Sequence, residues 1–321
     1  MSGNKSVQRP VRVVLLGPSL AAVSGVSTHL NMLFASALSQ QFELLHFQVG
    51  GEGRRESAFH RLLRLALSPL QLAAYLWRQR PAIVHLNSSM DAKAYWRDLA
   101  YLVVAKAMRC RMVFQVHGGA LPNDFFRGHS LLTGLLRRVL CLPDAVLVLS
   151  REELGAYRRF DARIAVHWVP NAIDPKGLAD VVRHFNADAP LRLVYVGRLV
   201  RAKGIFEIVQ AAALLKAEGR NFSLAIAGDW PDRAELQAFI AAQGVADRIE
   251  MLGGVFGAAK NRLWCESDVF LFPTVAEELP YVLLEAMAAG CVPVASPVGA
   301  IPDVVQDGIT KKKINLVHFL V

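Results

Sequence analysis

The chain has 321 residues, which is too many for one ordinary domain and suits two domains of α/β size. Its residues are 53% apolar and its net charge is +9, spread unevenly: residues 1–186 hold 23 Lys and Arg against 12 Asp and Glu, whereas residues 187–321 hold 13 against 15. The basic first half favours an anionic membrane surface or a phosphorylated acceptor, and the lack of a helix-turn-helix or RNP-like signature argues against nucleic acid.

The cysteines and the N-terminus indicate the compartment. The four cysteines have no paired C-x-x-C spacing and lie in apolar settings, so we expect buried, reduced thiols and a cytoplasmic location, at most on the inner face of the cell membrane. The basic start before Val13–Leu16 imitates a signal peptide, but Gly17 and Pro18 interrupt its apolar segment, and a buried strand explains it better. No uncharged apolar run is long enough to span a bilayer.

The first element is a predicted parallel strand at Val11–Leu16, because a short, continuous apolar run is typical of a strand buried on both faces. A loop of small residues follows, including Ser24 and Gly25, and then an apolar helix over Leu30–Leu38. Strand, small-residue loop and helix form an arrangement in which backbone amides can approach a ligand. The loop is not G-x-G-x-x-G, so an ordinary βα turn remains an equal alternative.

Residues 54–80 are both basic and apolar. Apolar residues keep helical spacing from Phe59 to Leu70 with arginines between them, and Ser68-Pro69-Leu-Gln71 resembles a capping box that starts a second helix ending near Arg80. Such a face can lie on anionic lipid. The interpretation that we favour is a core-facing helix with a solvated basic side.

Three further strands are predicted at Ala82–Leu86, Met112–Val116 and Ala145–Leu149. Each ends in polar or small residues, and the carboxyl edge of a parallel sheet is where open α/β folds bind ligands. His117 follows the second of these strands, beside two glycines. It is a candidate site residue, although a lone histidine is often structural. The segment from Pro175 to Pro190 is predicted to be the linker.

The second half begins with a predicted strand at Leu191–Val196, followed by Gly197-Arg198 and Lys203-Gly204. Two cations and two glycines at a strand-to-helix turn indicate a phosphate site, in which Arg198 binds as a fork and Lys203 as a point charge. A solvated basic loop is the alternative. The remaining elements are expected at Leu224–Ala227, Ile249–Leu252, Val269–Phe272 and Val292–Ala295 as strands, with a helix around Lys260–Glu266.

The segment from Phe272 to Gly290 combines an acidic loop with a helix start. Pro280 is expected at the first helical position, where a missing N–H costs nothing. Free amides at a helix start form an anion site, and Glu277 and Glu285 flank it eight residues apart. A ligand that is anionic in the middle and rich in hydroxyls at both ends fits this arrangement, as a nucleotide sugar does. Surface glutamates beside a helix start are the alternative.

The elements predict an α/β protein with two Rossmann-like, doubly wound parallel-sheet domains. We expect one domain at residues 1–186 and a second at residues 187–321, with strand-end loops that face each other across a cleft.

From Val11 to about Thr310 the chain resembles the family 4 glycosyltransferases, which have the GT-B fold and retain anomeric configuration. The most specific matches are Gly197-Arg198-Leu with Lys203-Gly204, and Glu277-x7-Glu285 followed by Ala-Met-Ala-x-Gly. The resemblance implies that Arg198 and Lys203 hold the donor diphosphate. It also implies that Glu285 binds the ribose and that Glu277, with Leu279 beside it, lies near the donor sugar.

The same resemblance implies roles in the first half. His117 matches a strand-end histidine near the reacting centre, and Ser24-Gly25 matches a glycine loop that approaches phosphate and acceptor. Asn171 matches a structural or site-lining turn residue. No metal cofactor is expected, because the chain has no Asp-x-Asp and its cations and helix-start amides would stabilise the leaving diphosphate.

Two departures from the family pattern stand out. Glu278 replaces a common glycine and adds a carboxylate beside the expected diphosphate. After Thr310 the residues Lys311–Val321 match no part of the family, as a frameshift or truncation would produce, so we expect an incomplete second domain with exposed apolar surface.

The leading hypothesis is a glycosyltransferase that transfers a sugar, with retention, from a nucleotide-diphosphate sugar to a glycan or lipid-linked acceptor. The product would be a surface polysaccharide, lipopolysaccharide or glycolipid. The alternatives are a nucleotide-sugar epimerase of the same fold and an inactive, truncated nucleotide-sugar-binding or scaffold protein. The sequence does not identify the donor base, the sugar or the acceptor, because fold does not fix substrate.

Overall fold

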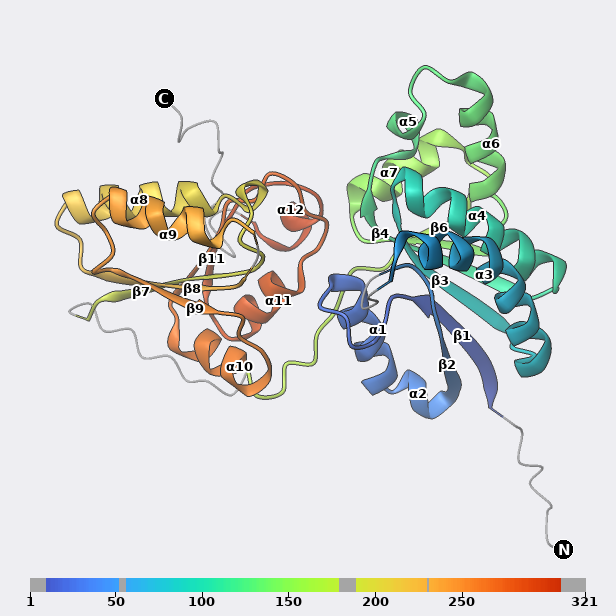
Figure 1. Ribbon diagram of the computed structural model, residues 1–321, viewed down its shortest axis with the longest axis horizontal. Helices are drawn as coiled ribbons and strands as arrows, with labels where there is room; N and C mark the ends of the chain where they lie inside the picture. The colour runs from blue at the N-terminus through green and yellow to red at the C-terminus, as the bar shows by residue number, and fades with distance from the viewer. Residues whose placement is uncertain (1–9, 52–55, 179–188, 230, 307–321) are drawn as a thin grey trace, which may run out of the picture. The chain divides into compact units, whose positions relative to one another are not determined.

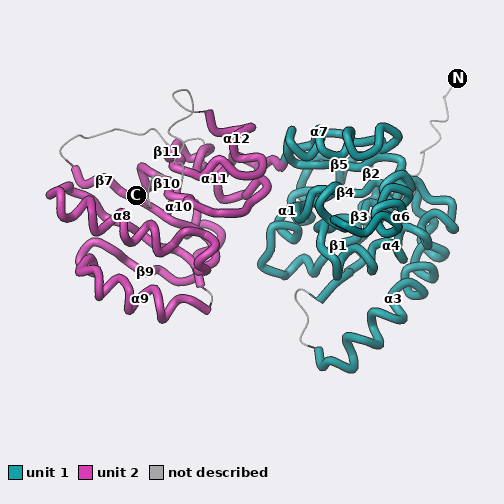
Figure 2. The backbone as a smooth tube through the Cα atoms, turned by 90° about the horizontal axis from the view of Figure 1, so that it is seen from above, with its two compact units in different colours: residues 1–170 teal, residues 171–321 magenta. Residues whose placement is uncertain are grey.

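The structure is a computed structural model that describes residues 10–51, 56–178, 189–229 and 231–306. The chain divides into two compact units, Met1–Pro170 and Asn171–Val321, and each has a parallel sheet with helices on both faces (Figures 1 and 2). The predicted fold class is confirmed. The predicted boundary at 186/187 and the divergent tail 311–321 lie outside the described residues.

The described part of unit 1 contains a six-stranded parallel sheet in the order β2-β1-β3-β4-β5-β6. Its strands are β1 Val11–Gly17, β2 Phe42–Gln48, β3 Ile83–Met90, β4 Arg111–Gly119, β5 Ala145–Val148 and β6 Val166–Trp168. Its helices are α1 Gly25–Ala35, α2 Leu38–Gln41, α3 Ala58–Gln79, α4 Ala92–Ala107, α5 Pro122–Phe125, α6 Ser130–Leu140 and α7 Arg151–Phe160.

Several predicted bounds in unit 1 were wrong. The first helix begins at Gly25, five residues earlier than predicted, because Ser24 caps it by accepting a hydrogen bond from the Ser27 N–H (3.3 Å). Strands β3 and β4 continue through polar residues that the sequence suggested were loops, and β4 includes His117. The edge strand β2 and the three-residue β6 were not predicted, since their mixed residues give little periodicity.

Helix α3 is one helix, not two, with Pro69 inside it. Proline has no N–H to donate to the carbonyl four residues earlier, and the Ser68 hydroxyl donates to that carbonyl of Leu65 instead (3.3 Å). The prediction that the apolar side of this helix faces the core and its basic side faces solvent was also wrong. The C-terminal half packs inward through Leu72 and Leu76, but the solvent-exposed face of the helix is apolar.

The described part of unit 2 contains a five-stranded parallel sheet in the order β11-β10-β7-β8-β9. Its strands are β7 Leu191–Val196, β8 Phe222–Ala227, β9 Ile249–Gly253, β10 Val269–Phe272 and β11 Val292–Ala295. Its helices are α8 Ile205–Ala217, α9 Arg233–Ala242, α10 Gly257–Glu266, α11 Tyr281–Ala288 and α12 Ile301–Val304, with a 3₁₀ turn η1 at Arg201–Lys203.

The core strands of unit 2 follow the apolar runs, and the predicted bounds of β7, β10 and β11 are confirmed. Phe270, Phe272 and Trp264 form a ring cluster in the core, with the two phenylalanine rings stacked and their centroids 5.1 Å apart. Pro280 is the N-cap of α11 and not its first helical residue. Of the four cysteines only Cys291 is fully buried, which corrects the expectation for the other three, and no two of the four form a disulfide with each other.

Candidate active site

Strands β7 and β10 are neighbours in the unit 2 sheet, so the loops at their carboxyl ends lie side by side. The loop after β7 carries Lys203 and the loop after β10 carries Glu277. The Lys203 ammonium forms an ion pair with the Glu277 carboxylate and also donates to the Ala276 carbonyl (3.2 Å). Both side chains are mostly enclosed, with 12% and 22% of their area exposed. The two residues therefore form one charged pair across 74 positions of sequence.

Glycines allow the loop before α11 to pack this closely. A Cβ at Gly204, whose φ is +71°, would lie 2.2 Å from the Pro273 carbonyl oxygen. A Cβ at Gly299, whose φ is +56°, would lie 1.8 Å from the Glu277 carbonyl oxygen. Any larger residue would push the acidic loop away, so these two glycines set the position of Glu277.

Arg198 stands at the start of the same basic loop, and its side chain is exposed. Its backbone carbonyl accepts a hydrogen bond from the buried Tyr195 hydroxyl (2.7 Å), which fixes the loop on the sheet. Burial raises the pKa of Tyr195, the charge of Glu277 raises it further, and Arg198 lowers it. Arg198 thus lies on the same loop as Lys203, with its backbone anchored to Tyr195.

Glu285 lies on α11 and has a different set of partners. Its carboxylate accepts hydrogen bonds from the Lys260 ammonium (2.8 Å) and the Trp264 indole N–H (3.2 Å), both on α10. Only 7% of the residue is exposed. The structure thus separates the two predicted carboxylates: Glu277 pairs with the β7 loop, and Glu285 is held against α10 by a charge and an indole.

The acidic loop is closed by Asn171. Its side-chain amide donates to the Leu279 carbonyl (2.8 Å), and its side-chain oxygen accepts from the Tyr281 hydroxyl (3.1 Å). Leu279 as a whole residue is 3% exposed. The Glu278 side chain is half-buried and its carbonyl accepts from the Ala300 N–H (2.9 Å).

In unit 1 the loop after β1 leads into α1, where Gly25 is the first helical residue and is exposed. No atom lies within 4 Å of where its Cβ would be, so the surface above the helix start is open. The Ser27 hydroxyl donates to the Ser19 carbonyl (2.7 Å) and the Asn31 amide donates to the Leu20 carbonyl (2.8 Å). These bonds tie the loop to the helix and keep the first-turn amides in place.

His117 lies near the end of β4, beside Asn87 of β3. The Asn87 amide nitrogen donates to the carbonyls of Leu16 (3.3 Å) and His85 (3.4 Å), which leaves its oxygen as the acceptor. That oxygen is 3.0 Å from Nε2 of His117. Nε2 therefore carries the proton, and Nδ1 keeps its lone pair for a ligand hydroxyl.

His117 is part of a group of three histidines with His29 and His85. The ring of His29, on α1, packs edge-on against His117 with centroids 4.7 Å apart, and Nε2 of His85 is 3.1 Å from the Gln115 side-chain oxygen. Burial lowers the pKa of His29 and of His85 to about 4. Burial first, and then His29 and His85, lower the pKa of His117 well below its ordinary value. All three rings are neutral at pH 7.

Sequence comparisons match both units to glycosyltransferases. Residues 23–176 match the family described as "Glycosyltransferase Family 4", and residues 180–314 match "Glycosyl transferases group 1". The chain belongs to the family 4 glycosyltransferases. A curated relative of this glycosyltransferase, 2-deoxystreptamine glucosyltransferase of Streptomyces kanamyceticus, is 32% identical over 193 residues, which cover 55% of this chain and 49% of the relative. The chain thus spans about half the length of that relative.

Solved structures share the fold of the glycosyltransferase. Sucrose-phosphate synthase from Thermosynechococcus elongatus superposes with a TM-score of 0.72 at 19% identity, over 95% of this chain and 86% of that one. Anabaena Alr3699/HepE in complex with UDP-glucose superposes with a TM-score of 0.69 at 15% identity, over 95% and 85%. These likenesses establish the GT-B fold. Among the residues that the structure describes, no helix of the glycosyltransferase is both long enough and apolar enough to cross a membrane.

Sequence reasoning overlooked four residues that support the predicted ones: Lys260, Trp264, Asn87 and His29. Lys260 and Trp264 are four apart on a helix that was predicted, so they lie on one face, and this spacing was an available signal. Asn87 follows the predicted strand directly, but its contact with His117 spans 30 positions of sequence. His29 was read as part of a loop, because the helix start at Ser24 was missed.

Proposed function

We propose that this glycosyltransferase moves a sugar from a nucleotide-diphosphate sugar to a glycan or lipid-linked acceptor, with retention at the anomeric carbon. The observation that carries the proposal is the enclosed Lys203–Glu277 pair at the adjacent carboxyl ends of β7 and β10, with Arg198 on the same loop as Lys203. A cation held by a carboxylate can transfer to a diphosphate, and the same exchange frees the carboxylate for sugar hydroxyls.

In this proposal Arg198 and Lys203 bind the donor diphosphate and stabilise its charge as the glycosidic bond to the donor breaks. Glu277 then accepts hydrogen bonds from the donor sugar, and the backbone of Leu279 completes the phosphate side of the site. Glu285 binds the ribose hydroxyls, with Lys260 and Trp264 fixing its orientation. No metal cofactor is needed where two cationic side chains carry that charge.

In unit 1 the proposal assigns His117 a place near the reacting centre, where its unprotonated Nδ1 accepts a hydrogen bond from a sugar hydroxyl. Gly25 and the exposed start of α1 approach phosphate or acceptor. The resemblance supports a reaction on one face, in which the leaving phosphate takes the proton of the acceptor hydroxyl. The solved complex of Anabaena HepE with UDP-glucose supports a nucleotide-sugar donor for this fold.

Calorimetric titration of the 321-residue chain with UDP, GDP and ADP tests the donor site. We expect saturable binding of one nucleotide, which would identify the donor base. Absence of binding by all three would contradict the proposal. Incubation with the matching nucleotide sugar, with and without an acceptor extract, separates the reaction classes: a product that changes the donor sugar without any acceptor would indicate an epimerase.

The acceptor side of the proposal includes peripheral contact with an anionic membrane through residues 54–80, on the cytoplasmic face. The described part of this segment is α3, whose large apolar side chains stand outside the core beside arginines, while Arg54 and Arg55 lie outside the described residues. Sedimentation with vesicles of anionic lipid at rising salt tests it. Binding that weakens with salt is expected, and no binding at low salt would remove this part of the proposal.

A further inference from the structure

Helix α3 presents three different faces. Leu72 and Leu76 point into the core and are 0% and 1% exposed. In an α-helix successive residues are rotated by 100° about the axis. On this projection of α3, a polar face adjoins the core-facing side, and a face of large apolar side chains adjoins the polar face. The polar face thus lies between the core and the apolar stripe, so a ligand bound on the polar face would also reach the stripe.

The apolar stripe of α3 consists of large side chains at helical spacing on the outer face. Phe59, Leu62, Leu70 and Trp77 are 71%, 69%, 68% and 68% exposed. From Phe59 to Trp77 the stripe extends over 18 residue steps, or about 27 Å at 1.5 Å per residue. A continuous exposed apolar surface of this length marks a contact site and not an ordinary solvated face.

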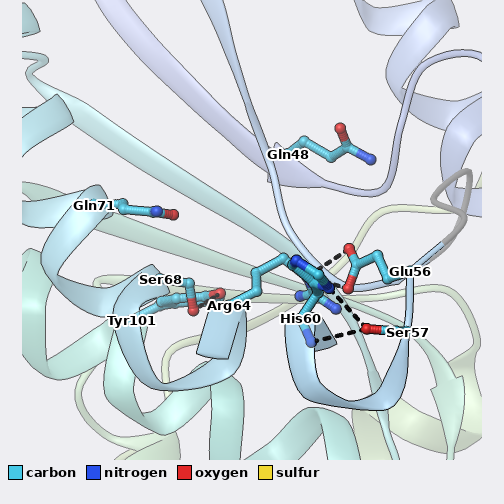
Figure 3. Close-up of a pocket in the computed structure, with 8 residues that line it drawn as sticks. All are labelled: Gln48, Glu56, Ser57, His60, Arg64, Ser68, Gln71 and Tyr101. Atoms are coloured by element: carbon cyan, nitrogen blue, oxygen red, sulfur yellow. Dashed lines mark hydrogen bonds and ion pairs between the residues drawn. The ribbon is translucent and has the colours of Figure 1, made fainter. Parts of the chain in front are cut away.

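The polar face lines a cavity of about 470 Å³, which lies within the usual range of about 300 to 1,000 Å³ for ligand sites. Figure 3 shows its walls, which combine the end of β2, the residues just before α3, the first 14 residues of α3 and one residue of α4. The lining residues are Gln48, Glu56, Ser57, His60, Arg64, Ser68, Gln71 and Tyr101. Every one of them has a polar side chain.

The described lining of this cavity contains the ion pair of Arg64 and Glu56. Nε of Arg64 donates to both oxygens of Glu56 (2.9 and 3.1 Å), and the two side chains are 14% and 17% exposed (Figure 3). Within the described residues, no acceptor bonds to the two terminal nitrogens of Arg64. The cavity therefore offers guanidinium donors, carboxylate acceptors, amides and hydroxyls, and its Arg64–Glu56 pair is neutral as a unit. This combination suits neutral sugar hydroxyls better than a phosphate.

We propose that α3 binds a membrane-borne glycolipid, with a neutral sugar in the Arg64–Glu56 cavity and the lipid along the stripe from Phe59 to Trp77. The inference rests on the proposed transfer to a lipid-linked acceptor and names its class. It places acceptor sugar binding and membrane contact on the same helix. The amide side chains of Gln48 and Gln71 give the cavity both donors and acceptors for ring hydroxyls.

The test uses the full chain and simple glycosides as probes. Octyl and methyl glycosides of glucose, galactose, mannose and N-acetylglucosamine are titrated below the micelle concentration, with saturation-transfer NMR to report which protons touch the protein. We expect at least one octyl glycoside to bind through both its ring and its chain. It should bind about tenfold or more tightly than its methyl counterpart, because burying two methylene groups is already worth about tenfold.

Three variants separate the parts of the site. The double substitution Glu56→Gln with Arg64→Gln removes both charges of the pair together, so neither partner is left as an unpaired charge. It should weaken the binding of the methyl and octyl glycosides about tenfold and abolish the saturation-transfer signal of their ring protons. Phe59→Ser with Leu70→Ser should abolish the advantage of the octyl chain and leave methyl binding unchanged. Leu131→Ser, at a leucine of α6 that is 89% exposed, is the matched control and should bind as the wild type does.

Several outcomes would overturn the inference: no glycoside bound by the wild type, unchanged ring contacts in the charge-free double variant, or an octyl advantage that survives in the stripe variant. If the double variant fails to fold by circular dichroism, the exposed Gln71→Ala replaces it. Nucleotide titration of the same samples keeps the two proposals apart. Nucleotide binding without glycoside binding overturns only the α3 site, and the reverse overturns only the donor assignment.

Discussion

The strand-end site of unit 1 is built from neutral side chains, whereas that of unit 2 is built from charged ones. Unit 1 places three histidines together, and desolvation keeps them neutral. Unit 2 forms two ion pairs, Lys203 with Glu277 and Lys260 with Glu285, and carries Arg198 on the loop of Lys203. A neutral site suits hydrogen bonds to sugar hydroxyls, and a site with exchangeable cations suits a diphosphate.

The difference teaches how one fold supports two kinds of recognition. Both sites lie at the carboxyl edge of a parallel sheet: unit 1 uses the ends of the adjacent strands β3 and β4, and unit 2 uses the loops after the adjacent strands β7 and β10. In unit 1 the partners of His117 are an amide and two further imidazoles. In unit 2 the carboxylate of Glu277 is paired with Lys203, and that of Glu285 is paired with Lys260. The edge positions the groups, and the side-chain types together with their burial set the charge.

The largest effect is expected from the cations of unit 2. Arg198→Ala with Lys203→Ala should lower kcat/KM about 10²- to 10³-fold or more, since each donor stabilises developing phosphate charge. Arg201→Ala is the matched control, because Arg201 lies on the same turn but pairs with Glu235 and is 64% exposed. Steady-state transfer assays measure both variants. Unchanged turnover in the double variant would show that the diphosphate is held elsewhere.

A second substitution would make the unit 1 site charged. Asn87→Asp puts a carboxylate 3.0 Å from Nε2 of His117, which should raise the pKa of that histidine towards pH 7 and protonate Nδ1. Loss of the Nδ1 lone pair should lower kcat/KM about 10- to 100-fold at pH 7. Nitrogen chemical shifts of the His117 ring follow its protonation. A ring that stays neutral together with normal activity would contradict the assigned tautomer.

The neutral histidines also predict an acid-sensitive unit 1. The pKa of His85 is about 4 in the folded protein and 6.5 in the unfolded chain. The stabilisation of the folded state that results from this difference is complete above pH 6.5 and is lost as the pH falls towards 4. The free energy of unfolding should fall over this window by about 2 to 3 kcal/mol for this residue. Urea denaturation of the wild type and of His85→Gln at several pH values measures the free energy of unfolding. If this free energy depended on pH equally in the two proteins, the prediction would be refuted.

The smallest expected effect comes from metal removal. If Arg198 and Lys203 carry the diphosphate charge, EDTA should change the transfer rate less than about twofold. Adding Mg²⁺ or Mn²⁺ back after chelation is the control. A rate that depends on the added metal would show that the cationic side chains of unit 2 do not suffice for the leaving group.

The sequence by itself determined the two-domain α/β class, the buried strands such as Leu191–Val196 and Val269–Phe272, and the candidate loops that follow them. These features depend on apolar runs and turn residues that are neighbours in the chain. It also identified Lys203 and Glu277 separately as site candidates. Local patterns sufficed because strand ends and helix starts are local.

Only the tertiary structure decided which of these residues meet. The Lys203–Glu277 pair depends on β7 and β10 being neighbours, and the tautomer of His117 depends on Asn87 of the adjacent strand. The continuity of α3 depends on the Ser68 hydroxyl taking over a carbonyl that Pro69 cannot satisfy. Strand order and side-chain direction are set by packing across long stretches of sequence, and periodicity in one segment carries no information about them.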